Sequence, residues 1–258
     1  MGQSESRIVP LVPNVMSASD ILADAEKKDG YLAAIQNNSI NSRARSENIY
    51  APFGNEFLNV NQNDNQFPKG IIISMMPSAD SGFPHTRGDN IICIPAYYPA
   101  EKLNHLLIHE RIHLDQKANR EAYDNFYKKH WGFKENNYTI PENILNLARI
   151  NPDTIGWPTY IWRDTWIPLC LFQREDKPNL RECSYCWYNP KGGVLLKSMP
   201  PAWRDFFGDV SQSEHPNELS ACYGADYEYY KDIEAARLFY SFIFTKQEFY
   251  RENSSRGE

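Results

Sequence analysis

A long run without glycine or proline restricts the folds available to this chain. It begins after Pro99, extends from about Ala100 to His130, and is rich in residues that favour helices. We therefore expect one long helix near the middle of the 258 residues, with the other elements arranged around it.

The motif HExxH lies inside this expected helix, as His109, Glu110 and His113. Residues four apart on a helix share one face, about 5–6 Å apart, so both imidazoles can reach one tetrahedral metal ion. Glu110 lies about 100° around the helix, where it reaches a water on the metal more readily than the metal itself. His105, one turn upstream, is interpreted as a packed residue or a support behind the ligands, because a reactive zinc site needs only three protein ligands.

This motif, on a long helix preceded by a strand, resembles the active-site helix of the zincin metallopeptidases. The third ligand distinguishes the branches of that superfamily. The metzincin pattern needs glycine at position 116 and histidine at position 119, where the chain has Gln116 and Asn119. The gluzincin branch takes a glutamate from a second helix. The resemblance implies Glu218 as that ligand, because it follows Pro216 and Asn217, where a helix should begin.

The segment from His215 to Glu218 resembles the His-Pro-x-Glu of minimal viral and bacterial zincins, and the Asn-Glu of thermolysin-like enzymes. Its spacing departs from compact gluzincins, because roughly a hundred residues separate His113 from Glu218. His215 stays open as a rival third ligand, although it precedes a proline in an expected loop.

The resemblance implies a zinc-dependent metallopeptidase, a hydrolase that cleaves peptide bonds, with Zn²⁺ as cofactor and a peptide or protein as substrate. Glu110 is then the general base that activates the water. Peptide hydrolysis also needs a donor for the developing oxyanion. The candidates for this role are Tyr223, Tyr227, His215 and Tyr160.

Three further motifs lie near the expected cleft. Gln116 shares a helical face with His113 and is a candidate for orienting ligands or substrate, with a surface amide as the alternative. His85 lies in a turn-rich segment beside the cleft and is a candidate substrate contact. Cys183 and Cys186 form a single CxxC pair, whereas a closed four-ligand zinc site needs a second pair.

The remaining patterns predict an α+β fold. It is zincin-like, with a small mixed sheet packed on the long HExxH helix and on a second, ligand-bearing helix. Short β-branched runs closed by proline predict strands at 70–76 and 90–94, separated by a turn-rich segment at 78–89. Apolar residues at helical spacing predict helices at 19–35, 141–150 and 217–250. A hairpin is expected at 160–172, a turn and short strand at 188–196, and a loop at 55–65.

One domain with short extensions is the expected organisation, because a chain of this length can form one hydrophobic core. Residues 1–40 are expected to form an N-terminal extension with a short helix. Residues 41–250 are expected to form the zincin-like domain, with an aromatic insert at about 151–212 that folds around the cleft. Residues 251–258 are expected to be a flexible tail.

Composition excludes several classes of protein. The formal net charge is -6 and no block of lysine or arginine occurs, so we expect no nucleic-acid partner. No segment approaches the roughly 18 apolar residues of a membrane-spanning helix, and no secretion signal is evident in the first thirty residues. The five scattered cysteines fit a reducing compartment, which predicts a cytoplasmic location.

The N-terminus, from Met1 to Ser6, meets the pattern for N-myristoylation of Gly2. Acylation would add peripheral membrane contact, although a single acyl chain holds a membrane only marginally. Two alternatives to an enzyme follow. One is a non-catalytic zincin-fold component of a membrane complex or a virus particle, and the other is a myristoylated adaptor with an accidental HExxH. Nothing in the sequence indicates an oligomer.

Overall fold

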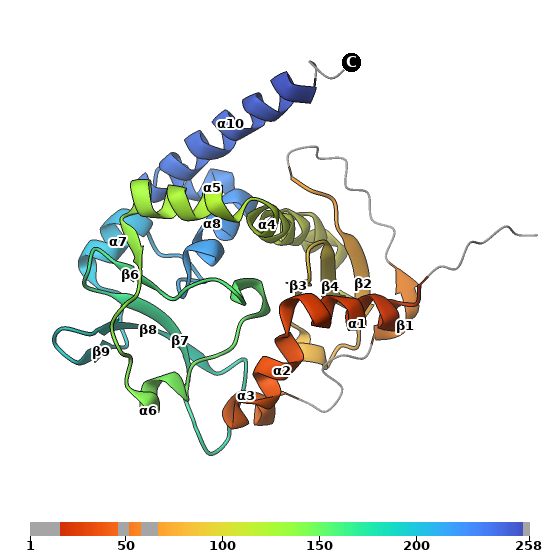
Figure 1. Cartoon of the computed structure of the whole chain (residues 1–258), viewed down its shortest axis with the longest axis horizontal. Coiled ribbons are helices and arrows are strands. Elements are labelled where there is room, and N and C mark those ends of the chain that lie inside the picture. Colours follow the sequence, from red (N-terminus) through yellow and green to blue (C-terminus); the bar gives the residue numbers. More distant parts are fainter. Residues whose placement is uncertain (1–15, 46–51, 58–66, 255–258) are drawn as a thin grey trace, which may run out of the picture.

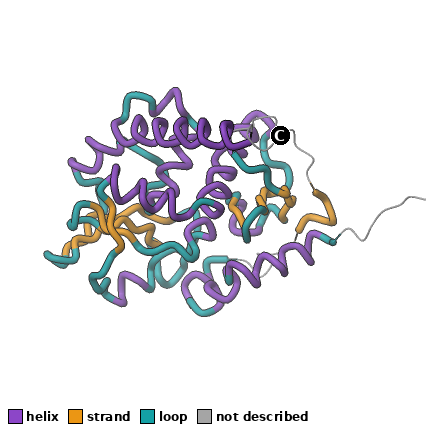
Figure 2. Tube along the Cα trace, turned by 45° about the horizontal axis from the view of Figure 1, so that its top comes forward, coloured by secondary structure: helices purple, strands orange, loops and turns teal. Residues whose placement is uncertain are grey.

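The computed structural model describes residues 16–45, 52–57 and 67–254. Helices are mixed with small sheets in this part of the chain, in agreement with the expected α+β class. The strands gather in two groups, with helices between and around them (Figure 2).

A four-stranded mixed sheet lies beside the N-terminal helices (Figure 1). Its order is β1 (Pro52–Phe57), β2 (Ile71–Met75), β4 (Ile91–Pro95) and β3 (His85–Arg87). The central pair β2 and β4 is parallel and both outer pairs are antiparallel. The two β-branched runs thus form the centre of the sheet, as predicted. The segment predicted as turn between them also contains β3 and the short 3-10 helix η1 (Ala79–Gly82).

Side chains alternate between the two faces of the central strands, and each face packs against a helix. One face contacts the HExxH helix α4 (Ala100–Ala118), where Ile92 and Ile94 meet Leu107 and Leu114. The opposite face contacts α1 (Ala18–Asp29) through Ile73, Met75, Ile91 and Cys93. Helices α4 and α1 therefore cover the two faces of the central strands. Packing against the sheet holds α4 in place.

The N-terminal helices are α1, α2 (Tyr31–Gln36) and α3 (Ser39–Arg43). Ser17 and Asp20 form a capping box at the start of α1. Gly30 has a φ of 61° between α1 and α2, a left-handed conformation that glycine adopts without strain. The predicted helices around Gly30 are confirmed. No sequence pattern predicted α3, which is only five residues long.

The long helix predicted from Ala100 to His130 is broken, so that prediction was wrong beyond α4. Asn119 has φ −127° and ψ 37°, and its side-chain amide donates to the Asp115 carbonyl at 3.1 Å and carboxylate at 2.8 Å. An asparagine that bonds the preceding turn in this way competes with the helical pattern. The chain continues in a new direction as α5 (Arg120–Phe126) and the π-helical turn η2 (Tyr127–Trp131).

Most aromatic side chains form one large core between α5, η2 and the C-terminal helices. These helices are α7 (Pro201–Phe207), α8 (Pro216–Ala225), α9 (Tyr227–Tyr230) and α10 (Glu234–Ser254). Trp131, Trp162 and Trp203 are all buried in this core. The predicted aromatic insert at about 151–212 supplies two of these three residues, so its aromatic side chains join the main core.

Two small antiparallel sheets complete the fold. One pairs β5 (Phe133–Glu135) with β6 (Tyr160–Trp162), and the other joins β7 (Ile167–Phe172), β8 (Cys183–Asn189) and β9 (Val194–Leu196). The predicted turn at Arg163 and Asp164 is present, with φ values of 49° and 52°. The strands on either side of this turn nevertheless separate into different sheets, so the predicted hairpin is limited to its tip. The predicted strand at 194–196 is confirmed.

Three other segments differ from expectation. The helix expected at 141–150 is reduced to the single turn α6 (Glu142–Leu145), followed by the 3-10 helix η3 (Pro152–Thr154). Residues 55–57 of the expected loop belong to β1, while 58–66 lie outside the described residues. The tail expected from residue 251 is helical as far as Ser254, where α10 ends.

Candidate metal centre

The two histidines of α4 and a glutamate of α8 converge on one point. The Nε2 atoms of His109 and His113 are 3.1 Å apart. Oε2 of Glu218 lies 3.4 Å from the first Nε2 and 3.5 Å from the second. This group could hold a metal ion, and among the residues that the structure describes it is the one group of at least three such side chains that converges closely enough.

The local sequence explains why α8 begins just before Glu218. His215 is the N-cap, and its Nδ1 accepts a hydrogen bond from the backbone N–H of Asn217 at 3.1 Å. Pro216 occupies the first helical turn, where its missing N–H has no cost. Glu218 then lies in that first turn, next to α4. Its side chain is 2% exposed.

A buried amide fixes the orientation of His113. Nε2 of Gln116 donates to the Asn217 carbonyl at 3.0 Å and to Ser220 Oγ at 2.8 Å. Because the amide nitrogen faces α8, its oxygen faces His113 and accepts from Nδ1 at 2.8 Å. His113 therefore carries a proton on Nδ1, and Nε2 is the nitrogen that faces the centre and would bind a metal in place of its own proton. Gln116 itself is fully buried, so the alternative that it is a surface amide was wrong.

Glu218 is held from the opposite side by the loop before η3. The Asn151 amide donates to Oε1 of Glu218 at 2.7 Å, and this leaves Oε2 directed at the histidines. Asn151 also caps η3, because its side chain accepts from the backbone N–H of Asp153. The same residue thus positions the glutamate and begins the turn that carries Asp153.

Glu110 is adjacent to this centre and is not part of it. Its side chain is 2% exposed, and in the described part of the chain its Oε2 has no hydrogen-bond partner. Burial, followed by the negative charge of Asp153, raises the pKa of Glu110 well above its ordinary value. A carboxylate with a raised pKa and an unused oxygen is suited to accepting a proton.

The three converging groups interact strongly. Burial opposes charge on all of them, but Glu218 and Asp153 raise the pKa of His113 to about 10. The pKa of Glu218 falls well below its ordinary value because of His113 and His109, against the effect of burial. The pKa of His109 is lowered, chiefly by burial. The positive charge of one protonated histidine therefore balances the Glu218 carboxylate. A metal cation bound between the three groups would balance it in the same way.

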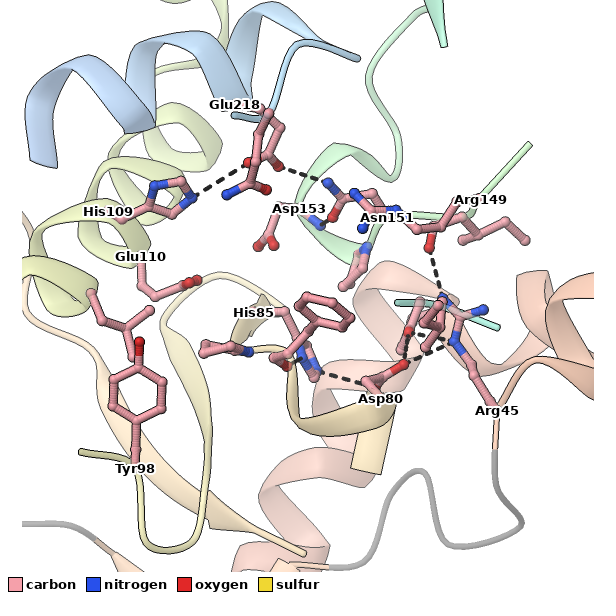
Figure 3. Close-up of a pocket in the computed structure, with 18 of the residues that line it drawn as sticks. Arg45, Asp80, His85, Tyr98, His109, Glu110, Arg149, Asn151, Asp153 and Glu218 are labelled. Atoms are coloured by element: carbon pink, nitrogen blue, oxygen red, sulfur yellow. Dashed lines mark hydrogen bonds and ion pairs between the residues drawn. The ribbon is translucent and has the colours of Figure 1, made fainter. Parts of the chain in front are cut away.

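A cavity of about 250 Å³ opens beside Glu110 and continues away from the metal centre (Figure 3). Its lining combines residues from several separate parts of the sequence. Those that carry the argument below are Arg45, Asp80, His85, Tyr98, Arg149 and Asp153. Sequence reasoning singled out only His85 among these. Tyr98 directly precedes the proline that opens α4, and Asp153 follows an Asn-Pro turn, which are the signals that could have identified them.

The structure does not bring the four residues predicted to stabilise the oxyanion to the cavity beside Glu110. Tyr223 is fully buried, and its hydroxyl donates to the Phe207 carbonyl at 2.6 Å. Tyr227 is 47% exposed and packs on Tyr240. The Tyr160 hydroxyl donates to Asp124 at 2.7 Å. None of them is among the residues that line the cavity.

The rival third ligand, His215, does not join the metal centre. Its Nδ1 caps α8, and its Nε2 lies 3.3 Å from the carbonyl oxygen of Pro158. Burial lowers the pKa of His215 to about 4, so the ring is neutral. Both nitrogens are occupied by the backbone, which explains why the structure brings Glu218 to the histidines instead.

The other sequence motifs have the following positions. His85 and His105 line the cavity, and neither belongs to the converging group. Cys183 and Cys186 lie on β8 and have free thiols. Gly2 lies outside the described residues, so its predicted acylation stays a prediction. In the described ranges, no helix is both long and apolar enough to cross a membrane.

Comparisons with known proteins gave no match. No protein-family model matches the chain, and neither the curated proteins nor the solved structures contain a significant match to it.

Proposed function

We propose that the protein is a zinc-dependent metallopeptidase of the zincin type, with His109, His113 and Glu218 as metal ligands and Glu110 as general base. The observation that carries this proposal is the convergence of three metal-binding atoms from two helices beside the buried carboxylate of Glu110, whose Oε2 has no partner within the described residues. The supporting network of Gln116 and Asn151 orients these atoms, as expected for a prepared site.

The spacing of the ligand atoms fits a small tetrahedral ion. Bonds of about 2.0–2.1 Å at tetrahedral angles separate neighbouring ligand atoms by roughly 3.4 Å. The three separations here are 3.1, 3.4 and 3.5 Å. Two imidazoles with one carboxylate suit zinc, whereas calcium and magnesium prefer oxygen ligands at larger coordination numbers. Three protein ligands would leave a fourth position for water or substrate.

When bound, zinc polarises a carbonyl and lowers the pKa of a water molecule. The protein's own contribution is to move the proton. Glu110 follows the first ligand on α4 and faces the cavity, where its free Oε2 can accept the proton of the attacking water (Figure 3). The same carboxyl group can then deliver that proton to the leaving amine.

Tyr98 takes the place of the four residues expected to stabilise the oxyanion. It lines the cavity, and its hydroxyl points towards Glu110 (Figure 3). Burial and the charge of Glu110 raise the pKa of this phenol, which keeps its proton available for donation. We propose Tyr98 as the donor to the developing negative charge on the substrate carbonyl.

The experiment is a digest of a peptide library with the zinc-loaded protein, compared with two variants. Glu110→Gln should retain zinc and lose hydrolysis by at least roughly 100-fold, because a general base contributes about 10²–10⁴-fold. His113→Ala should lose the metal itself. Glu121→Gln, an exposed carboxylate on α5, is the matched control and should behave as wild type.

Full cleavage by Glu110→Gln would refute the assignment of the base. Stable zinc binding by the wild-type protein without cleavage of any peptide would favour the alternative of a non-catalytic zincin-fold component. Chelation should stop wild-type hydrolysis, and added zinc should restore it.

A further inference from the structure

The cavity has a second group of hydrogen-bond acceptors beyond the metal centre. It consists of Asp80, His85 and Asp153, which are 3%, 4% and 5% exposed. In the described part of the chain, Oδ2 of Asp80 has no hydrogen-bond partner. Its nearest charged or chargeable neighbour on that side is His85 Nε2, at 3.8 Å, which is beyond hydrogen-bond distance.

The tautomer of His85 makes this wall rich in acceptors. Its Nδ1 lies 3.1 Å from the carbonyl oxygen of Phe83. Because a carbonyl can only accept, Nδ1 carries a proton, so Nε2 is the ring nitrogen that can offer a lone pair to a donor. Asp80 Oδ2 and His85 Nε2 therefore face each other at 3.8 Å, and within the described residues no hydrogen-bond donor reaches the carboxylate oxygen. A ligand with N–H groups would satisfy both.

Asp153 adds negative charge to the same wall. Its Oδ1 is used by Thr86, which donates its backbone N–H at 2.7 Å and its hydroxyl at 2.5 Å. The carboxylate lies in the cavity between Glu110 and His85 (Figure 3).

The cationic residues of the lining are already paired. The Arg45 Nε donates to Asp80 Oδ1 at 2.8 Å, and its other nitrogens donate to Asn41 and to the Ile150 carbonyl. Arg149 forms an ion pair with Glu214. A divalent cation at the metal centre, together with Arg45 and Arg149, would balance the four carboxylates of the described lining. Because Glu214, outside the lining, already neutralises Arg149, one negative charge is left over.

We propose that this wall of Asp80, His85 and Asp153 binds a cationic group of the substrate, either a lysine or arginine side chain or a free amino terminus. The inference rests on the proposed peptidase function and gives it a substrate class. The cavity is smaller than the roughly 300–1,000 Å³ of pockets for drug-sized ligands, so one such group fits rather than a longer segment.

The test uses the zinc-loaded Glu110→Gln protein and pooled peptides that differ at one fixed position. That position carries arginine or citrulline, which has nearly the same shape without the charge. Each pool is made with a free and with an acetylated amino terminus. Arginine pools, or free-amine pools, should bind roughly 10- to 100-fold more tightly than their neutral partners, the range given by charge-assisted hydrogen bonds.

The four peptide pools distinguish the two possible sources of the positive charge, a side chain and the amino terminus. A preference for arginine in acetylated pools assigns the wall to a side chain. A preference for the free amine alone assigns it to the amino terminus. Equal binding of all four pools would overturn the inference. Absence of cleavage by the wild-type enzyme, together with a preserved charge preference in binding, would overturn the proposed function and leave the cationic site standing.

One substitution tests whether the preference for a cationic group arises at this wall of the cavity. Asp80→Asn keeps an oxygen for Arg45 and removes the charge, so it should abolish most of the preference. Asp89→Asn, an exposed carboxylate outside the cavity, should leave it unchanged. Full preference in a folded Asp80→Asn protein would contradict the assignment. The comparison of arginine with citrulline requires no substitution at Asp80, so it still tests the site if that variant does not fold.

Discussion

At the scale of single residues, Gln116 shows how a buried amide prepares a metal ligand. Its nitrogen is committed to α8, so its oxygen is the atom that meets His113. The amide therefore fixes the imidazole tautomer and also links the two helices that carry the ligands. A hydrophobic side chain of similar length would lose both effects.

Gln116→Met should weaken zinc binding by about 10- to 100-fold, the usual effect of removing a residue that orients a ligand. The measurement is a competition titration with a chelator of known affinity. Gln173→Met, an exposed amide on the turn after β7, is the control and should bind zinc as wild type does. Unchanged affinity in a folded Gln116→Met protein would show that His113 needs no partner.

The sequence predicted part of this site at residue scale. His109, Glu110 and His113 are recognisable because helical periodicity fixes their relative positions. Glu218 could be proposed from its place after a proline and a capping residue. For Asp153 and Tyr98 a neighbouring proline is the one local signal, and it does not record that their loops approach the cavity.

At the scale of elements, the site depends on how closely α4 and α8 approach. Gly224 lies on α8, and a Cβ atom there would be 2.1 Å from Cδ1 of Ile112 on α4. Ile112 is fully buried and has little room to move. Glycine is therefore required by contact between the helices rather than by its backbone angles.

Gly224→Ala should destabilise the protein by about 1–3 kcal/mol through overpacking, even though alanine favours a helix by about 1 kcal/mol relative to glycine. The double variant Gly224→Ala with Ile112→Val removes the methyl group in the way and should recover most of the loss. Urea unfolding of the three proteins measures this. A single variant as stable as wild type would show that α8 can shift freely.

The element predictions succeeded where one local pattern decides the structure. The strands at the sheet centre and the helices around Gly30 are examples. The predicted long helix failed at Asn119, because no glycine or proline marks the break. Its cause is a side-chain hydrogen bond to Asp115, which also accepts from Tyr123 and Lys246. Such a tertiary network leaves no periodic signal.

At the scale of the whole molecule, the N-terminal helices connect the mixed sheet to the rest of the fold. Arg45 follows α3, pairs with Asp80 beside the sheet and donates to the Ile150 carbonyl before η3. Asn41 donates to the Ala148 carbonyl and accepts from the Ile150 N–H. In Figure 1, α2 and α3 lie between the two strand groups. Tyr31, within the expected extension of residues 1–40, and Arg45, just beyond it, both line the cavity, so this N-terminal segment closes one end of it.

Arg45→Met should lower the free energy of unfolding by about 3–5 kcal/mol, because it leaves the buried Asp80 carboxylate without its cationic partner and with only the Tyr31 hydroxyl as a donor among the described residues. Both side chains of this pair are at most 5% exposed. Arg174→Met breaks an exposed pair with Asp176 and should change stability by less than about 1 kcal/mol. Denaturant unfolding of both variants provides the comparison, and equal effects would contradict a role for Arg45 as a buried link.

The most direct test of the metal centre is the zinc content per chain of two matched variants, Glu218→Ala and His215→Ala. The wild-type protein should bind one zinc ion per chain. We expect Glu218→Ala to lose it, and His215→Ala to retain it because this ring only caps α8. Retention of zinc by Glu218→Ala, or its loss only from a folded His215→Ala protein, would contradict the proposed ligand set.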